Sequence, residues 1–475
     1  STKNANILNE YDFINRDSVT GNELNDGGGQ DGHGSIVFST VSGFQQDSLI
    51  GIAPHAQFLL AKTEDLPTEQ HLEEDNYAAA VEWEEAQGAD IISSSLGYSD
   101  FNQPDEENYS FSDFDGKTTI AAIAVNKAVY RGVVCITAAG NDGPRDSSLI
   151  TPSDADSVIA VAAVAEDGIT PARFTSRGPR GDGVIKPDIA SQGVKVVCCA
   201  VGDSSALSEA SGTSLATPLM AGSTTLFLSV FPELRPWEIR KFLYETASNA
   251  SEKNDTLGFG RANIPAAMLK AGTIISPAVP TFPVRDRQRV VVFIRSESPI
   301  LSAKITVQFA NVQYTYNLYP TDKPYQYIAE FPFVHFAGKN AQAFVTVDDG
   351  KSSRRMPYKP NTTFSITPNT TVIPCGIDPD SLPYAPDLLS SVEVVPNLAE
   401  AKHDEVTVQM LLEKESDITI KIYNMVGQLV YTIDSPSRMR GVNVLTLPIT
   451  SFPIGTYFVV AQYEGRVELT RFIKI

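Results

Sequence analysis

Cysteine and histidine are scarce in this chain of 475 residues, which has four cysteines and five histidines. Four cysteines are too few for a disulfide framework, and no CxxC pair or Cys/His cluster of the kind that binds zinc is present. Cys135 lies in one apolar run and Cys198 and Cys199 in another, where cysteine acts as a small core residue. Cys375 stands alone in a Pro-rich stretch.

Long apolar runs and positive charge are also lacking. No run of about 18 apolar residues is present, which excludes a transmembrane helix of ordinary length. The net charge of −20 argues against nucleic acid as a partner. The acidic stretches 64–75 and 105–107 predict solvated loop or helix faces. Stretch 22–31 could bind structural calcium, but it has no recognisable ligand spacing, so we assign no metal ligand and expect no cofactor.

What the chain does have is a short run that is typical of an active site. Residues 211–218 read Ser-Gly-Thr-Ser-Leu-Ala-Thr-Pro, after a small and flexible run at 208–212, and an apolar helix is predicted over 215–230. Ser214 would lie in the first turn, where free N–H groups and the helix dipole stabilise negative charge. A nucleophilic hydroxyl needs such a place, although Ser and Thr also cap helices without any catalytic role.

Two upstream segments accompany this run. His33 stands between glycines in Asp-Gly-His-Gly-Ser, ahead of an apolar run, although a histidine in such a place is often structural. Asn141 ends Ala-Ala-Gly-Asn after an apolar strand at 133–138, which is also an ordinary exit from a strand into a turn.

Together these segments resemble the subtilases, the subtilisin-like serine proteases, over roughly residues 10–270. Further similar elements lie between them in family order, at 51–54, 60–62, 91–97, 174–179 and 186–189. The resemblance implies that Ser214 attacks the scissile carbonyl, that His33 accepts its proton, and that Asn141 binds the oxyanion. It also implies two walls that bind an extended peptide, with glycines that leave room between them for a substrate side chain; the walls are Ser95, Leu96 and Gly97, and Ala138, Ala139 and Gly140.

The third member of the catalytic triad is not evident. The family places an Asp at the end of an apolar strand upstream of the His, and we expect no such strand among the 32 residues before His33. Asp12, Asp17, Asp26 and Asp31 lie in polar surroundings. We therefore expect the chain to begin partway into the protease domain, with the Asp upstream. The alternative is a catalytically impaired, subtilase-like binding or adhesion module at the cell surface.

The order of elements predicts an α/β protease domain followed by two all-β domains. Strands are predicted at 55–61, 90–95, 133–138, 158–163 and 194–200, and helices at 77–87, 118–131, 215–230 and 237–247. Residues 258–271 resemble the closing segment of a subtilase domain. Strands separated by helices predict a mostly parallel sheet covered by helices on both faces. The predicted domains are 1–275 for the protease, 285–375 for an accessory β-sandwich and 388–475 for a second β-sandwich.

The last segment has a pattern of its own. Alternating strands with Gly-centred turns, Gly-Thr-Tyr at 455–457 and a basic-apolar end resemble the type A C-terminal sorting domain of the type IX secretion system. The alternative is an ordinary accessory sandwich of the fibronectin type III kind. If the sorting domain is real, the protein is secreted or at the cell surface, and its partners are protein or peptide substrates and the type IX secretion machinery.

Overall fold

The computed structural model describes residues 5–24, 26–45, 48–66, 68–280, 287–309, 312–332, 341–358, 361–366, 392–395, 398–399, 404–412, 415–424, 428–438, 441–464 and 466–474. Cys375 and the Pro-rich stretch 374–386 lie outside them. By contacts the chain divides into two compact units. One comprises residues 1–281, 289–331 and 338–368, and the other comprises the remaining residues.

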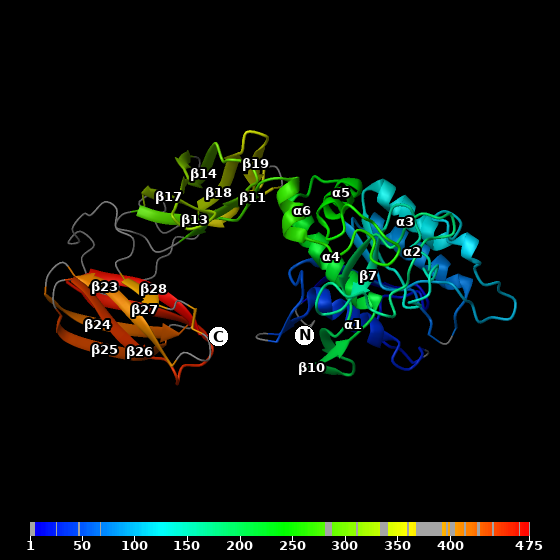
Figure 1. Cartoon of the computed structure of the whole chain (residues 1–475), viewed down its shortest axis with the longest axis horizontal. Coiled ribbons are helices and arrows are strands. Elements are labelled where there is room, and N and C mark those ends of the chain that lie inside the picture. Colours follow the sequence, from blue (N-terminus) through cyan, green and yellow to red (C-terminus); the bar gives the residue numbers. More distant parts are fainter. Residues whose placement is uncertain are drawn as a thin grey trace. The chain divides into compact units, whose positions relative to one another are not determined.

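A four-stranded parallel sheet forms the centre of the α/β region, which is the helix-containing part of the first unit (Figure 1). Its strands, in spatial order, are β5 (Ile91–Ser94), β6 (Val134–Ala138), β7 (Ile159–Val164) and β8 (Ile189–Gln192). Every residue of β6 and β7 is buried. Such continuous apolar runs are typical of strands covered on both faces.

Helices cover both faces of this sheet. Because side chains alternate along a strand, Val134 and Ile136 of β6 pack on one face and Cys135 packs on the other. The first face is covered by α4 (Thr213–Val230), α5 (Pro236–Thr246) and α6 (Ile264–Ala271). The second is covered by α2 (His71–Ala86) and α3 (Ile120–Arg131). The predicted α/β fold with helices on both faces is confirmed.

Local sequence sets the ends of these helices. Thr119 caps α3 by accepting the N–H of Ala122, and Gly132 follows its last residue at φ +114°, a conformation that glycine adopts without strain. Asn263 caps α6 in the same way. Helix α2 begins at His71, earlier than predicted, because Gln70 and Glu73 form a capping box.

A second, smaller parallel sheet pairs β1 (Asn6–Asp12) with β4 (Gln57–Lys62). No apolar strand of the kind that carries the catalytic Asp was expected before His33, and β1, which the sequence did not predict at all, is instead a strand with a mostly polar and exposed sequence. Helix α1 (Asp31–Ser42) packs against α4, and its Phe38 ring lies 5.0 Å from the Phe58 ring of β4. A short hairpin of β2 (Phe44–Gln45) and β3 (Leu49–Ile50) follows α1.

Three details of the predicted topology were wrong. Residues 194–200 do not join the parallel sheet, because β9 (Val196–Ala200) pairs antiparallel with β10 (Asp203–Ala210). Residues 208–210, predicted as a flexible run, belong to β10. In addition, the connections from β6 to β7 and from β7 to β8 contain no helix. The short 3₁₀ helix η1 (Phe111–Asp113) lies in the loop between β5 and α3.

An antiparallel sandwich follows the α/β region within the same unit. One sheet comprises β11 (Ile274–Ile275), β12 (Val279–Pro280), β13 (Arg287–Arg295), β16 (Tyr319–Pro320) and β17 (Gln326–Pro332). The other comprises β14 (Ser302–Phe309), β15 (Val312–Asn317), β18 (Ala341–Asp348), β19 (Ser353–Met356) and β20 (Phe364–Ile366). Alternate residues of β13 and β18 are buried between them, as in β-sandwiches generally.

Arg354 is one residue that links the α/β region to this sandwich within the unit. Arg354 of β19 donates to the carbonyl of Val230 at 2.9 Å, at the end of α4, and pairs with Glu233 at 2.6 Å. Its guanidinium also lies 4.2 Å from the centre of the Phe231 ring. The predicted boundary between residues 275 and 285 therefore does not separate two independent compact bodies, and the three-domain division stays a prediction.

The second unit holds the other sandwich. Strands β21 (Val392–Val395), β23 (Glu405–Leu412) and β26 (Gly441–Pro448) form one sheet. Strands β22 (Leu398–Ala399), β28 (Arg466–Lys474), β27 (Gly455–Tyr463), β24 (Ser416–Asn424) and β25 (Leu429–Arg438) form the other. Their facing side chains make one apolar core that includes Val408, Ile420, Leu447 and Phe472. Two all-β sandwiches were predicted, and both are present.

Candidate active site

Ser214 lies in the first turn of α4, beside the end of β5. Its Oγ is 3.5 Å from the carbonyl oxygen of Ser95, and the Ser95 hydroxyl donates to the carbonyl of Ser214 at 2.8 Å. The side chain is half-buried, so it still reaches solvent. The N–H groups of a first helical turn have no acceptor within the helix, so that of Ser214 is placed to stabilise a negative oxygen next to its own side chain.

Asn141 is joined to the same turn by the residue that precedes Ser214. The Asn141 Oδ1 accepts the backbone N–H of Thr213 at 2.9 Å and the Thr213 hydroxyl at 3.1 Å. A backbone N–H can only donate, so this contact fixes which end of the amide is oxygen. The NH₂ end of the exposed Asn141 side chain is therefore left to donate to another group.

The residues predicted to bind substrate lie at the ends of two neighbouring strands of the parallel sheet. Ser94 of β5 pairs with Thr137 of β6, so the segments after these strands leave the same edge of the sheet. Ser95, Leu96 and Gly97 are half-buried, whereas Ala138, Ala139 and Gly140 are fully buried.

The backbone of the second wall is already occupied. The Ala139 N–H donates to Val161 and the Gly140 N–H to the Thr213 hydroxyl, while the Gly140 carbonyl accepts the N–H of Ser176. The resemblance predicted that an extended peptide pairs with both walls. Because these groups of the second wall already have partners, the Ser95–Gly97 wall is the one left to pair with a peptide.

One side chain lies next to the glycines of both walls. The side chain of Ile150 lies there, close enough that a Cβ added at Gly97 would be 2.6 Å from its Cδ1. A Cβ added at Gly140 would be 3.2 Å from its Cγ1. The space predicted between the walls is therefore narrowed by Ile150, because the segment before Thr151 returns to this edge of the sheet. No pattern around Ile150 in the sequence indicated that return.

His33 lies in the first turn of α1, a helix that packs on the ribbon leading to Ser214. Ser39 of α1 accepts the N–H of Cys199, and the Ser35 carbonyl lies 3.3 Å from the Cys199 sulfur. The His33 side chain is exposed, yet neighbouring groups desolvate the ring enough to lower its pKa. Within the described residues the ring has no hydrogen-bond partner, so the structure does not join His33 to Ser214 by a direct bond.

The carboxylates upstream of His33 are engaged elsewhere. Asp12 ends β1 and is fully buried, where it accepts the N–H of Ile14 at 2.7 Å and forms an ion pair of 2.7 Å with Lys62. Lys62 also binds Asp26 at 2.7 Å, and this hydrogen bond lowers the pKa of Asp26. Asp12 and Asp26 are therefore structural residues of this corner.

One group of possible metal ligands occurs among the described residues. Carboxylate oxygens of Asp12, Asp17 and Glu23 lie within 4.8 Å of one another. Lys62 already neutralises part of this charge, and the amide of Asn15 donates to both Asp12 and Glu23. Carboxylate oxygens suit calcium, but these internal partners satisfy the group, so we assign no ion to it.

The three cysteines within the described residues are free and buried, which confirms their prediction as core residues. They contribute nothing to the candidate site.

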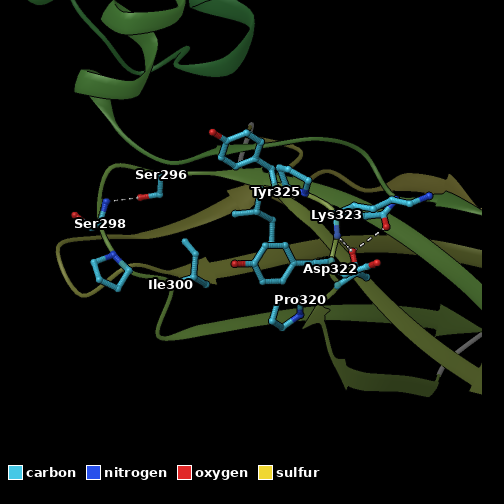
Figure 2. Close-up of a pocket in the computed structure, with 13 residues that line it drawn as sticks. Ser296, Ser298, Ile300, Pro320, Asp322, Lys323 and Tyr325 are labelled. Carbon is cyan, nitrogen blue, oxygen red and sulfur yellow. Dashed lines mark hydrogen bonds between the residues drawn. The ribbon is translucent and has the colours of Figure 1, made fainter. Parts of the chain in front are cut away.

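A hollow of about 390 Å³ lies on the first sandwich and contains no predicted site residue. Figure 2 shows its rim, which includes Ser298, Asp322 and Tyr325 from the loops at the ends of the strands. The N–H of Ser298 donates to Ser296 and that of Lys323 to Thr321, so these polar groups serve the turns themselves. The candidate active site is therefore at the strand ends of the α/β region and not in this hollow.

Comparisons with known proteins match two parts of the chain. Residues 3–261 match the model of the Subtilase family, and residues 402–475 match that of the Secretion system C-terminal sorting domain. Over 252 residues the chain is 30% identical to Subtilisin DY of Bacillus licheniformis, covering 52% of this chain and 81% of that protein. Over 159 residues it is 33% identical to Serine protease AprX of Bacillus subtilis (strain 168), covering 30% of this chain and 36% of that protein.

Among solved structures the chain is similar to Sphericase, with a TM-score of 0.41 and 26% identity over 54% of this chain and 84% of that one. In the part of the chain that the structure describes, no helix is both long enough and apolar enough to cross a membrane. The sorting domain indicates a protein that is secreted or at the cell surface. With a family match that spans more than half of its residues, the chain belongs to the subtilase family of serine proteases and ends in a secretion sorting domain.

Proposed function

We propose that this protein is a secreted endopeptidase that cleaves peptide bonds through an acyl-enzyme on Ser214. The Ser214 oxygen attacks the scissile carbonyl while His33 accepts its proton and then delivers it to the departing amine. Water then hydrolyses the acyl-enzyme by the same steps. His33 takes a proton from the water, the resulting hydroxide attacks the ester carbonyl, and Ser214 recovers its proton as the acid product leaves. The lowered pKa of His33 supports this role, because a base must be neutral at working pH.

The observation that carries the proposal is the orientation of Asn141. Thr213 holds the Asn141 oxygen through two hydrogen bonds, so the amide NH₂ can donate to an oxyanion beside Ser214 without reorganisation. An asparagine that only formed a turn would not need its amide to be held by a helix terminus 72 residues further along the chain.

A second candidate function is supported by the surroundings of His33. Within the described residues no carboxylate is bonded to its ring, and Asp12 and Asp26 are engaged with Lys62. A histidine without such a partner lacks the group that orients it and stabilises its charged form. The second candidate is therefore a catalytically impaired subtilase-like module that binds peptides or surfaces without cleaving them.

Labelling with a fluorophosphonate separates the two candidates. The full chain, folded as judged by near-UV circular dichroism, is treated with the probe alongside the Ser214→Ala variant and assayed for casein hydrolysis. An active protease labels and cleaves casein, and Ser214→Ala does neither. A folded wild type that neither labels nor cleaves supports the binding module, whereas cleavage retained in Ser214→Ala means that another residue is the nucleophile.

We further propose that the sorting domain directs export through the type IX secretion system and that the protease acts on extracellular proteins. The two-sheet sandwich and the family match of residues 402–475 support this. Deleting residues 390–475 should trap the protein in the periplasm of a type IX-competent host, as measured by cell fractionation. Normal export of the deletion variant would contradict the sorting role.

A further inference from the structure

Ile150 occupies the space between the two walls that we expect to bind substrate. Ile150 Cδ1 and Cγ1 would lie 2.6 and 2.7 Å from a Cβ at Gly97, and Cγ1 would lie 3.2 Å from a Cβ at Gly140. Real side-chain carbons do not approach as closely as the two distances at Gly97, whereas the distance at Gly140 is a tight contact. The isoleucine therefore leaves room for glycine only at Gly97 and packs closely against Gly140.

The backbone around Ile150 is held in place, so the side chain cannot withdraw as a whole. Thr151 and Tyr98 exchange two backbone hydrogen bonds of 2.9 and 3.3 Å, which fasten the Ile150 segment to the end of the first wall. The Ile150 carbonyl accepts the N–H of Ser153 at 3.0 Å, and the neighbouring Leu149 is buried. A β-branched side chain on a fixed backbone has few rotamers to choose from.

Ile150 also keeps part of its surface in contact with solvent. Its side chain is half-buried, whereas Leu149 before it and Thr151 after it are buried. It therefore presents an apolar surface to whatever enters between the walls. Behind Gly140, the Ser176 hydroxyl closes the remaining space, at 2.6 Å from the position of an added Cβ.

We propose that Ile150 is a specificity-determining residue that shortens the pocket for the substrate side chain next to the scissile carbonyl. This inference rests on the proposed function of the Ser214 site. A pocket between two backbone walls would hold an aromatic ring only if its far end were empty, and here that end is filled. The protein then prefers glycine, alanine or serine at this position of the substrate and discriminates against phenylalanine and leucine.

Discrimination of this kind has a limited and measurable size. Inserting excess atoms into a packed site forces its walls apart, whereas a small side chain leaves them undisturbed. A hydrophobic pocket discriminates by about 10- to 200-fold for a mismatch of this order. We expect alanine to exceed phenylalanine by about 10- to 100-fold in kcat/KM, and the preference to reverse when Ile150 is shortened.

The test compares the full-length wild type with Ile150→Ala, Ile150→Val and, as a matched control, Ile169→Ala. Ile169 has 75% of its surface exposed and lies in a loop of the same region. Two peptide p-nitroanilides that differ only in alanine or phenylalanine before the scissile bond are assayed. The proposal predicts reversal in Ile150→Ala, an intermediate ratio in Ile150→Val and the wild-type ratio in Ile169→Ala. A wild type that prefers phenylalanine, or a ratio unchanged in Ile150→Ala, overturns it.

Binding without turnover keeps this inference separate from the proposed function. The product peptides ending in alanine or phenylalanine are titrated into the wild type and the Ile150→Ala variant by calorimetry, with fluorophosphonate labelling of Ser214 measured in parallel. If labelling fails but the alanine peptide binds the wild type more tightly and the variant reverses this order, the pocket stands and the protease proposal falls. If labelling succeeds but the two peptides bind equally to both proteins, the pocket proposal falls alone.

Discussion

The two parallel sheets of the α/β region have similar apolar strands but very different burial. Every residue of β7 is buried in the four-stranded sheet, whereas Phe58, Leu59 and Leu60 of β4 are each only half-buried. Strand β7 has hydrogen-bonded neighbours on both edges, while β4 pairs only with β1. Both strands are apolar, so composition does not explain the difference in burial. A strand is fully buried when it has neighbouring strands on both edges and helices on both faces.

The residues of the candidate active site fall into two groups, one associated with each of these two sheets. Ser214 and Asn141 lie at the ends of elements packed on the four-stranded sheet, and Thr213 joins them by hydrogen bonds. His33 lies on α1, whose Phe38 packs on β4, and its ring is exposed and unbonded within the described residues. The hydroxyl and amide half of the site is thus preorganised by packing and hydrogen bonds, whereas the imidazole half is not.

Removing the imidazole gives the largest expected effect and tests whether the two halves work together. His33→Ala should lower kcat for a peptide substrate by about 10⁶-fold, the size found when the histidine of a subtilisin is removed. Residues that act as one unit are not additive, so His33→Ala with Ser214→Ala should be no slower than either alone.

The exposed His55 provides the control for this prediction, because His55→Ala removes the same ring from the same region. Equal activity in the His33→Ala and His55→Ala variants would mean that the His33 ring takes no part in catalysis.

Asn141 tests the preorganised half. Asn141→Ala should lower kcat by about 10²- to 10³-fold, as for the oxyanion-hole amide of a subtilisin, with little change in KM, because the oxyanion exists only in the transition state. Steady-state kinetics separate the two constants. A rise in KM with kcat unchanged would assign Asn141 to ground-state binding instead.

Truncations in the two sheets test the difference in burial directly. Ile159→Ala in β7 should lower the free energy of unfolding by about 2–5 kcal/mol, because Ile159 is fully buried. Leu60→Ala in β4 should cost about 1 kcal/mol, since part of its side chain already contacts water.

Denaturant unfolding followed by tryptophan fluorescence reports on this region selectively. The two tryptophans of the chain, Trp83 in α2 and Trp237 in α5, both lie in the α/β region. Equal losses for the two variants would show that the β1–β4 pair is as well packed as the central sheet.

The smallest expected effect is on the pH dependence of stability and comes from replacing Glu64, which lies just after β4. Burial raises the pKa of Glu64 from 4.5 to about 7. The folded protein then holds a proton that the unfolded chain has lost, so stability falls as the pH rises from about 4.5 to about 7. Glu64→Gln keeps the acceptor for Tyr98 and should raise the free energy of unfolding by about 1–2 kcal/mol at pH 8, with no gain at pH 4.

The exposed Glu82→Gln serves as the control for Glu64, since it removes one charge from α2 without changing a buried carboxyl. An equal gain at pH 4 and pH 8 in Glu64→Gln would mean that the effect is not one of proton binding.

Periodicity predicted most helices and the buried strands well, because their apolar spacing matches the surface that they bury. It failed where tertiary contacts decide. Strand β1 is mostly polar and forms only because β4 supplies its partner, while β10 forms because β9 turns back upon it. The stretch 64–75 was predicted to be solvated, yet Glu73 and Glu74 are buried.

Local hydrogen bonds explain these buried acids. Glu73 accepts the N–H groups of Asp65 and Gln70, and Glu74 accepts the Tyr109 hydroxyl. Tyr109 and Asp65 lie far enough from these acids in sequence that no local pattern pairs them. The candidate site shows the same division. The sequence motifs indicated Ser214 and Asn141, whereas the structure identified Thr213 as the residue that links them.

The sequence by itself determined the α/β class, the two sandwiches and the family, because these depend on local periodicity and on short motifs whose chemistry is carried by a few adjacent residues. Only the tertiary structure decided which backbone groups remain for a substrate, that Ile150 fills the space between Gly97 and Gly140, and that Asp12 is committed to Lys62. Those outcomes depend on distances between residues far apart in the chain, and such distances are set by packing rather than by any local pattern.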